Sequence, residues 1–136
     1  MSNDERTCEY FLTTTDVFGS PVVCKETTYR YKLLKDHPDF CAREDFCEIL
    51  ESVLVSPDLV AHRGSNSENL GDSVINHEEI RYNFYKGLEN EESEKYVKVV
   101  VEYVGKTGDV VTTHLMSPKK YESDLKRNVE TIYQAE

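Results

Sequence analysis

The sequence predicts one α+β domain, in which N-terminal helices and a C-terminal helix pack on a small, mainly antiparallel four-stranded sheet. The chain has 136 residues, the length of one typical domain, so residues 1–136 are expected to form a single domain. Apolar residues recur with a helical period in the first half and alternate with a strand period over residues 79–116. Because the two patterns are segregated along the chain, they favour an α+β fold over alternating βαβ units.

The first part of the chain supplies one predicted helix. Residues 1–8 are polar and are predicted to be disordered. Residues 9–25 are expected to form a turn flanked by short extended pieces. Residues 26–36 are predicted to be helical and to end before Pro38, because proline disfavours the α region for the residue that precedes it.

Residues 44–54 carry the most regular helical pattern in the chain. Their apolar side chains share one face, which is formed by Phe46, Ile49, Leu50, Val53 and Leu54. Pro57 follows, and Asp58–His62 is predicted to be a short strand whose exposed edge could pair with another chain. Residues 63–78 form a long predicted loop, and a loop of this length is either functional or disordered.

Three longer strands and a final helix are predicted next. The strands are expected at Glu79–Lys86, Lys95–Val104 and Asp109–Met116, and residues 105–108 form a four-residue hairpin loop between the last two. Ser117 resembles an N-cap, with proline following at the first helical position. The apolar face of the predicted C-terminal helix consists of Tyr121, Leu125, Val129 and Ile132.

The hairpin loop also predicts which side chains share a face of the sheet. If residues 105–108 form the loop, Val104 pairs with Asp109, and side chains then alternate between two faces. The face expected to pack on the helices is mainly apolar, and it includes Thr112 and His114. The opposite face is polar and includes Arg81, Asn83, Tyr85, Lys98, Glu102 and Thr113. Because a slip of one residue exchanges the faces, Thr112 and Thr113 both stay candidates for the polar face.

Composition narrows the classes of function. The net charge of −10 disfavours a general nucleic-acid binder, because an acidic surface repels phosphate groups. No cysteine pair has zinc or redox spacing and no histidine has a partner at metal-ligand spacing, so neither a metal site nor a cofactor is predicted. The N-terminus lacks an apolar signal core and no apolar run is long enough to cross a membrane, which predicts a cytoplasmic protein.

The predicted polar face carries residue types that suit phosphodiester chemistry. Arginine donates bidentate hydrogen bonds to phosphate oxygens. A glutamate or histidine could take the proton of a ribose 2′-hydroxyl while a second group protonates the leaving oxygen, and this chemistry requires no metal ion. The same pattern also fits a solvated sheet face with cross-strand ion pairs, so the residue types leave both interpretations open.

A series of short motifs resembles a known family. The motifs are Tyr29–Asp39 with its His-Pro-acidic end, Pro57–Val60, Arg81–Lys86, Lys98–Val101 and Val110–Thr112. Their order over residues 20–116 resembles that of the phage-associated barnase–EndoU–colicin–RelE-like nucleases. The resemblance implies a toxin-like or phage-borne, metal-independent ribonuclease fold. It also implies that a histidine transfers protons while arginine and lysine stabilise the charge that develops on phosphate.

The resemblance and the polar face together define the candidate site. The predicted catalytic residues are His37, Arg81, Thr112 and Thr113. The predicted substrate-binding residues are Tyr82, Tyr85, Lys86 and Lys98. The long segment 63–78 and the acidic segment 87–94 depart from the family pattern.

Two functions remain open at this point. An endoribonuclease would act on RNA and would bring His37 and Arg81 into one concave site. A non-catalytic acidic module on the same fold would bind a protein partner or inhibitor. In that case, we expect His37 and Arg81 to lie apart or to be neutralised by nearby carboxylates.

Overall fold

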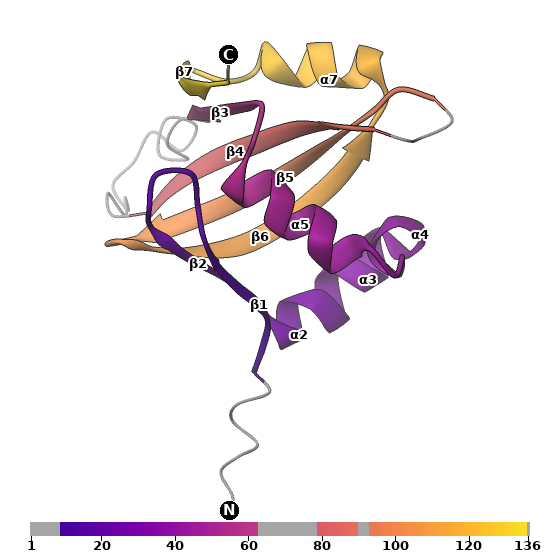
Figure 1. Ribbon diagram of the computed structural model, residues 1–136, viewed down its shortest axis with the longest axis vertical. Coiled ribbons are helices and arrows are strands. Elements are labelled where there is room, and N and C mark those ends of the chain that lie inside the picture. Colours follow the sequence, from indigo (N-terminus) through magenta and orange to yellow (C-terminus); the bar gives the residue numbers. More distant parts are fainter. Residues whose placement is uncertain (1–8, 63–78, 90–92, 136) are drawn as a thin grey trace, which may run out of the picture.

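The computed structural model describes residues 9–62, 79–89 and 93–135, and its centre is one mixed sheet of seven strands. In chain order the strands are β1 (Tyr10–Thr15), β2 (Pro21–Lys25), β3 (Leu59–His62), β4 (Glu79–Leu88), β5 (Lys95–Val104), β6 (Thr107–Met116) and β7 (Glu130–Gln134). Across the sheet their order is β1-β2-β6-β5-β4-β3-β7 (Figure 1). The pair β2–β6 is parallel, and the other neighbouring pairs are antiparallel. The predictions of disorder at residues 1–8 and of a loop at residues 63–78 lie outside the described residues.

The prediction of a small four-stranded sheet was wrong, because the sheet has seven strands. Strands β1 and β2 arise from the segment that was predicted as a turn with short extended pieces. They pair with each other, and β2 then joins β6 at Gly108 and Asp109. Strand β7 arises from residues that were predicted to continue the C-terminal helix. Pairing between strands depends on partners that are distant in the sequence, so local patterns underestimate it.

The C-terminal helix α7 (Pro118–Leu125) begins as predicted but ends earlier. Its N-cap is Ser117, whose hydroxyl accepts a hydrogen bond of 3.2 Å from the backbone N–H of Lys120. After the helix ends, the backbone N–H of Val129 donates to the carbonyl of His62 at 2.9 Å, and β7 pairs with β3. Strand β3 therefore lies between β4 and β7, and the edge that was predicted to be exposed is covered.

The N-terminal half contains the other helices. Three short segments follow one another over the predicted helical range: α2 (Glu26–Thr28), the π-helical turn η1 (Tyr29–Leu33) and α3 (Leu34–Asp36). Pro38 then begins α4 (Pro38–Cys41), and α5 spans Phe46–Val55. Within the described part of the chain, no helix is both long enough and apolar enough to cross a membrane.

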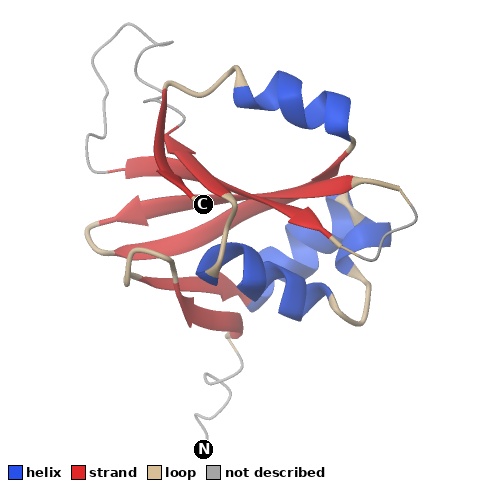
Figure 2. Cartoon of the chain, turned by 45° about the horizontal axis from the view of Figure 1, so that its top comes forward, coloured by secondary structure: helices blue, strands red, loops and turns tan. Residues whose placement is uncertain are grey.

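Helices cover the two faces of the sheet unequally. On one face, α5 buries Phe46, Leu50, Val53 and Leu54 against side chains of β4 and β5 such as Phe84. On the other face, α7 packs Tyr121 and Leu125 over a smaller group formed by Ala61, Tyr85 and Met116. Figure 2 shows α7 on the opposite side of the sheet from the other helices. Complete burial of one large apolar side chain stabilises a fold by roughly 1.5–3 kcal/mol, so the α5 face dominates stability.

The register of β6 differs from the predicted one. The turn after β5 consists of Gly105 and Lys106 alone, so Val104 pairs with Thr107 and not with Asp109. Gly105 adopts φ +66°, a conformation that glycine reaches without steric cost. Further along, Val101 pairs with Val110 but Val100 pairs with Thr112, which leaves Val111 as an extra residue in a β-bulge.

The bulge at Val111 corrects the predicted faces. Thr112 and His114, which were predicted on the apolar face, lie on the face that carries Lys98. Thr113 pairs with Val99, is fully buried, and donates from its hydroxyl to the carbonyl of Lys98 at 3.0 Å. A bulge shifts the alternation by one residue and so exchanges the faces of everything that follows it.

Of the two strand glycines Gly87 and Gly108, Gly108 has less room for a side chain. A Cβ atom there would lie 2.7 Å from Cγ1 of Val101 and 2.8 Å from Cε2 of Tyr103. Gly108→Ala should therefore lower the free energy of unfolding by about 1–3 kcal/mol, as overpacked cores do, in urea denaturation. Gly87→Ala is the matched control, because its Cβ would meet Tyr96 at 3.4 Å, an ordinary contact. Equal losses in the two variants would contradict the assigned packing.

Candidate functional site

Two histidines that are distant in the sequence lie together beside β6. The rings of His37 and His114 have their centroids 4.8 Å apart and are nearly perpendicular, at 77°. The backbone of His37 is held on both sides, because its N–H donates to the carbonyl of Leu33 and its carbonyl accepts from Cys41, each at 2.9 Å. Both side chains are half-buried, so both rings keep some contact with solvent.

Strand pairing sets the position of His114, and its surroundings set its protonation. It lies opposite Lys98 on β5. Burial lowers the pKa of His114 from its ordinary 6.5 to about 4, and the positive charges of His37, Lys98 and Lys120 act in the same direction. Asp124 opposes this shift without reversing it. His114 is therefore neutral at pH 7 and can accept a proton, and a strong pKa shift of this kind is common at functional sites.

A buried polar network lies next to the histidines, between the sheet and α7. The Lys98 ammonium lies 2.9 Å from Oδ2 of Asp124, and Tyr85 donates from its hydroxyl to the same oxygen at 2.7 Å. Asn128 donates to the Tyr85 hydroxyl at 2.9 Å and accepts from Asn83 at 2.7 Å. The network holds the end of α7 on the sheet, and Lys98 is only 9% exposed.

The charges within this network balance one another. Burial alone would raise the pKa of the Asp124 carboxyl, but the hydrogen bond from Tyr85 and the Lys98 ammonium outweigh it and lower that pKa. Asp124 therefore stays ionised and keeps Lys98 neutralised. Breaking a buried pair of this kind by removing one partner typically costs roughly 3–5 kcal/mol, because an unpaired charge stays buried.

Arg81 lies in a different part of the same sheet face. It pairs with Glu102 on β5, and its Nε lies 3.3 Å from the Glu102 carboxylate. The register places Arg81 four residues along β4 from Tyr85, which shares the row of Lys98 and His114. With strands about 4.8 Å apart and a rise of about 3.4 Å per residue, Arg81 and His114 are separated by roughly 17 Å. The structure does not bring Arg81 and His37 together.

The other predicted site residues are divided between the two faces. Thr112 is half-buried on the His114 face, whereas Thr113 is buried on the α5 face. Tyr85 and Lys98 belong to the polar network. Tyr82 lies on the α5 face, and the Lys86 ammonium donates to the carbonyl of Ser56 at 2.7 Å.

Sequence reasoning missed three residues at the centre of this site. His114 was placed on the wrong face, because no residue type in β6 signals the bulge. Asp124 lies three positions after Tyr121 and one before Leu125, beside the apolar face that was recognised in the last helix. A carboxylate at the margin of a buried face requires a cationic partner, and that signal could have linked Asp124 to Lys98. Asn128 gave no comparable signal.

Comparison with known proteins gives no further guide, since no family model, curated protein or solved structure matches this chain. Among the residues that the structure describes, no group of three or more histidine, cysteine, aspartate or glutamate side chains could hold a metal ion. The histidine pair and its surroundings therefore define the chemistry that this site can perform.

The pKa of His114 generates a prediction about stability and pH. Between pH 6.5 and about 4 the unfolded chain carries a proton on this histidine that the folded protein does not. The unfolded state then binds more protons, so stability falls as the pH falls through this window. The loss should reach about 3 kcal/mol near pH 4, measured by urea denaturation at several pH values.

His114→Gln should remove most of that pH dependence, whereas His62→Gln should keep it. His62 is a matched control because it is also half-buried and also contacts another ring, that of Tyr82 at 5.7 Å. If His114→Gln lost stability with falling pH as steeply as the parent protein, the assignment of the shift to His114 would be wrong.

Proposed function

We propose that the protein cleaves RNA by acid–base catalysis, with His37 and His114 as the proton-transferring pair. The observation that carries this proposal is the contact between the two imidazoles, 4.8 Å apart, next to the cationic side chain of Lys98. The imidazole of His37 lies close enough to disfavour the charged form of His114, which keeps His114 available as a proton acceptor.

The proposed reaction needs one proton acceptor and one proton donor. His114, neutral at pH 7, would take the proton of a ribose 2′-hydroxyl, and the oxygen would attack the adjacent phosphorus. The bond from phosphorus to the 5′-oxygen breaks, and His37 would give that oxygen a proton. The products are a 2′,3′-cyclic phosphate and a free 5′-hydroxyl. Both proton transfers use protein side chains, so the mechanism requires no metal ion.

Positive charge near the pair would stabilise the pentavalent phosphate. Lys98 is buried and paired with Asp124, so it is not expected to contact the phosphate directly. Lys120, exposed at the start of α7, has no ion-pair partner within the described residues, although its charge reaches His114. Lys120 is therefore the cation that we expect to contact a phosphate, and the Thr112 hydroxyl lies on the same sheet face as His114.

The test is cleavage of fluorescent RNA oligomers by the purified protein in EDTA at low salt. His37→Ala and His114→Ala should each lower the rate by about 10²–10⁴-fold, the usual contribution of a general acid or base. An oligomer with a single 2′-deoxy substitution at the cleaved position should resist. Folding of each variant is checked by circular dichroism and thermal unfolding.

His62→Ala is the control histidine, since it lies on the other side of the sheet and should retain full activity. Arg81→Ala should cause only a small loss, because its pairing with Glu102 keeps it away from the reacting phosphate. The proposal fails if the parent protein cleaves none of several RNAs, or if both histidine variants remain active.

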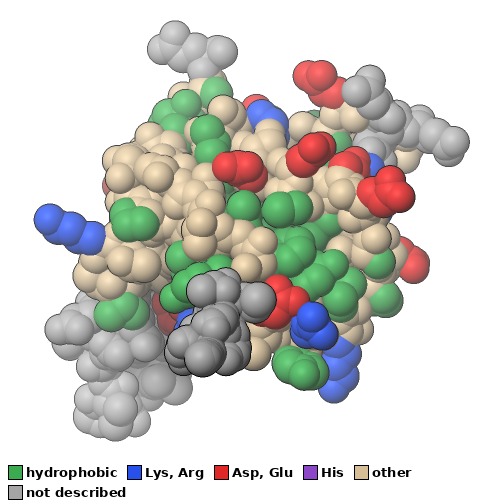
Figure 3. Space-filling model, turned by 60° about the horizontal axis from the view of Figure 1, so that its bottom comes forward, with side chains coloured by type: hydrophobic (Ala, Val, Ile, Leu, Met, Phe, Trp, Pro, Cys, Tyr) green, Lys and Arg blue, Asp and Glu red, His purple; other side chains and the backbone are tan. Residues whose placement is uncertain are grey.

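One observation favours a second function, that of a non-catalytic acidic module that binds a basic protein. Arg81 is paired with Glu102 and Lys98 with Asp124, so two cations expected to serve RNA are already neutralised. The net charge is −10, and several Asp and Glu side chains gather over the upper right part of the face drawn in Figure 3. Absence of cleavage together with salt-sensitive binding to basic proteins would favour this function.

A further inference from the structure

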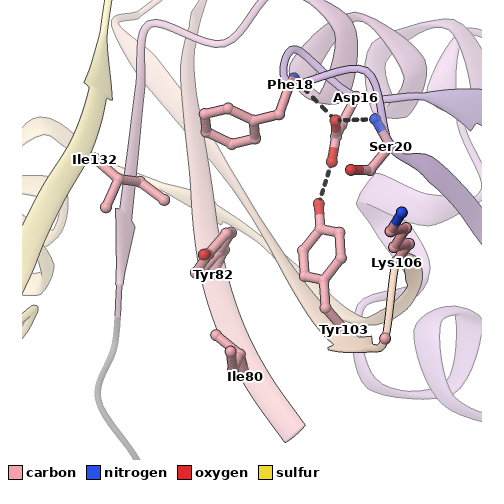
Figure 4. A pocket seen from close by; sticks show the side chains of 9 residues that line it. Asp16, Phe18, Ser20, Ile80, Tyr82, Tyr103, Lys106 and Ile132 are labelled. Carbon is pink, nitrogen blue, oxygen red and sulfur yellow. Dashed lines mark hydrogen bonds between the residues drawn. The ribbon is translucent and has the colours of Figure 1, made fainter. Parts of the chain in front are cut away.

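A second concave site lies on the α5 face of the sheet, opposite the histidine pair. It is a hollow of about 370 Å³ at the end of the molecule where the turn between β1 and β2 meets β4, β5 and β7. Figure 4 shows the side chains that surround it. Its lining includes Phe18, Tyr82, Ile80, Ile132, Ser20 and Lys106. None of them belongs to the proposed nuclease chemistry.

One wall of this hollow is rigidly built. The carboxylate of Asp16 is only 5% exposed and accepts hydrogen bonds from the backbone N–H groups of Phe18 and Ser20, each at 2.9 Å. It also accepts from the hydroxyl of Tyr103, which rises from β5 (Figure 4). These bonds fix the turn that presents Phe18, so the wall is formed before any ligand arrives.

The hollow has an apolar end with aromatic and aliphatic surface left uncovered. The Phe18 ring meets the Tyr82 ring edge-on at 6.2 Å, yet 45% of Phe18 is exposed. Ile80 is 38% exposed, and Ile132 stands on the far side of Phe18 and Tyr82 from Asp16 (Figure 4). A ring-sized apolar group would remove this surface from water, as ligands do in most small-molecule pockets.

The other end of the hollow is polar and positively charged. Ser20 and Lys106 lie on one side of the Asp16–Tyr103 hydrogen bond, and the apolar side chains of Phe18 and Tyr82 lie on the other (Figure 4). Neither the Ser20 hydroxyl nor the Lys106 ammonium has a partner within the described part of the chain. Asp16 already accepts three hydrogen bonds and makes no ion pair with Lys106. A ligand oxygen with negative charge would find both a hydroxyl donor and a cation here.

We propose that this hollow, from here on the aromatic pocket, binds a small aromatic carboxylate. The ligand's ring would pack against Phe18, and its carboxylate would lie at Lys106. The same chemistry is offered by the C-terminus of a peptide that ends in an aromatic residue. The sheet separates the pocket from the histidine pair, so the test of ligand binding does not depend on whether the protein cleaves RNA.

The test is an NMR titration of the isotope-labelled protein with 3-phenylpropanoate, its neutral amide, and the corresponding amine. The acid should shift the backbone signals of Phe18, Tyr82 and Lys106, with a dissociation constant on the order of 1 mM or below, as expected for a ligand of this size. The amide should bind about fivefold more weakly, the usual effect of one exposed ion pair, and the amine more weakly still. Absence of shifts at these residues, or tighter binding of the amine, would overturn the proposal.

Substitutions distinguish the contribution of the Phe18 ring to ligand binding from that of the Lys106 charge. Phe18→Ala should abolish binding of both the acid and the amide. If the Phe18→Ala protein is unstable, Ile80→Ser replaces it, with the same expected result. Lys106→Gln should reduce binding of the acid to the level of the amide, whereas Lys119→Gln, an exposed lysine on α7, should change neither. Unchanged affinity for the acid in Lys106→Gln would contradict the assigned role of the charge.

A second titration distinguishes a small aromatic carboxylate from a peptide C-terminus as the ligand. The peptide Gly-Gly-Phe is compared with its C-terminally amidated form at the same residues. Tighter binding of the free peptide than of phenylpropanoate identifies a chain end as the natural ligand, and weaker binding identifies a small molecule. Equal binding of the free and amidated peptides would contradict recognition of the carboxylate.

Discussion

The pairing of β6 with β5 carries one extra residue, Val111, and the arrangement of side chains around the sheet follows from that irregularity. Before the bulge, Val110 faces α5 with Val101, and after it Thr113 does so with Val99. Thr112 and His114 therefore point to the same side as Lys98. Without the extra residue, the register would place the polar hydroxyl and imidazole in the apolar layer, where unpaired polar groups are costly. The bulge separates an apolar face from a polar one along a single strand.

Charge is the second constraint on this acidic chain. Its partly buried cations on the polar face are matched with carboxylates: Lys98 with Asp124, and Arg81 with Glu102. The first of these pairs also positions secondary structure, because Asp124 belongs to α7, and Asn128, just after it, bonds to Tyr85. From there the chain enters β7. One buried ion pair with its hydrogen bonds thus links the last helix, the centre of the sheet and its edge.

The sheet also separates two sites with different physical characters. The histidine pair depends on electrostatics, since burial and neighbouring cations keep His114 neutral. The aromatic pocket depends on shape, since Asp16 holds a turn that presents Phe18 over Tyr82. Each is assembled from segments at opposite ends of the chain. The sheet brings distant segments of the chain together by pairing β2 with β6 and β3 with β7.

Elements that depend on short-range patterns were predictable from the amino-acid sequence. The apolar face of α5, the helical run that ends before Pro38, the Ser117 cap and the pairs of long strands were all predictable from periodicity and backbone preference. His37 was also identifiable, because the following proline restricts its backbone. The pairing of distant segments emerged only in the folded protein: the seven-stranded sheet, the bulge at Val111, and the contact of His37 with His114. Register and long-range contacts depend on the summed fit of distant segments, and no single stretch of residues encodes that fit.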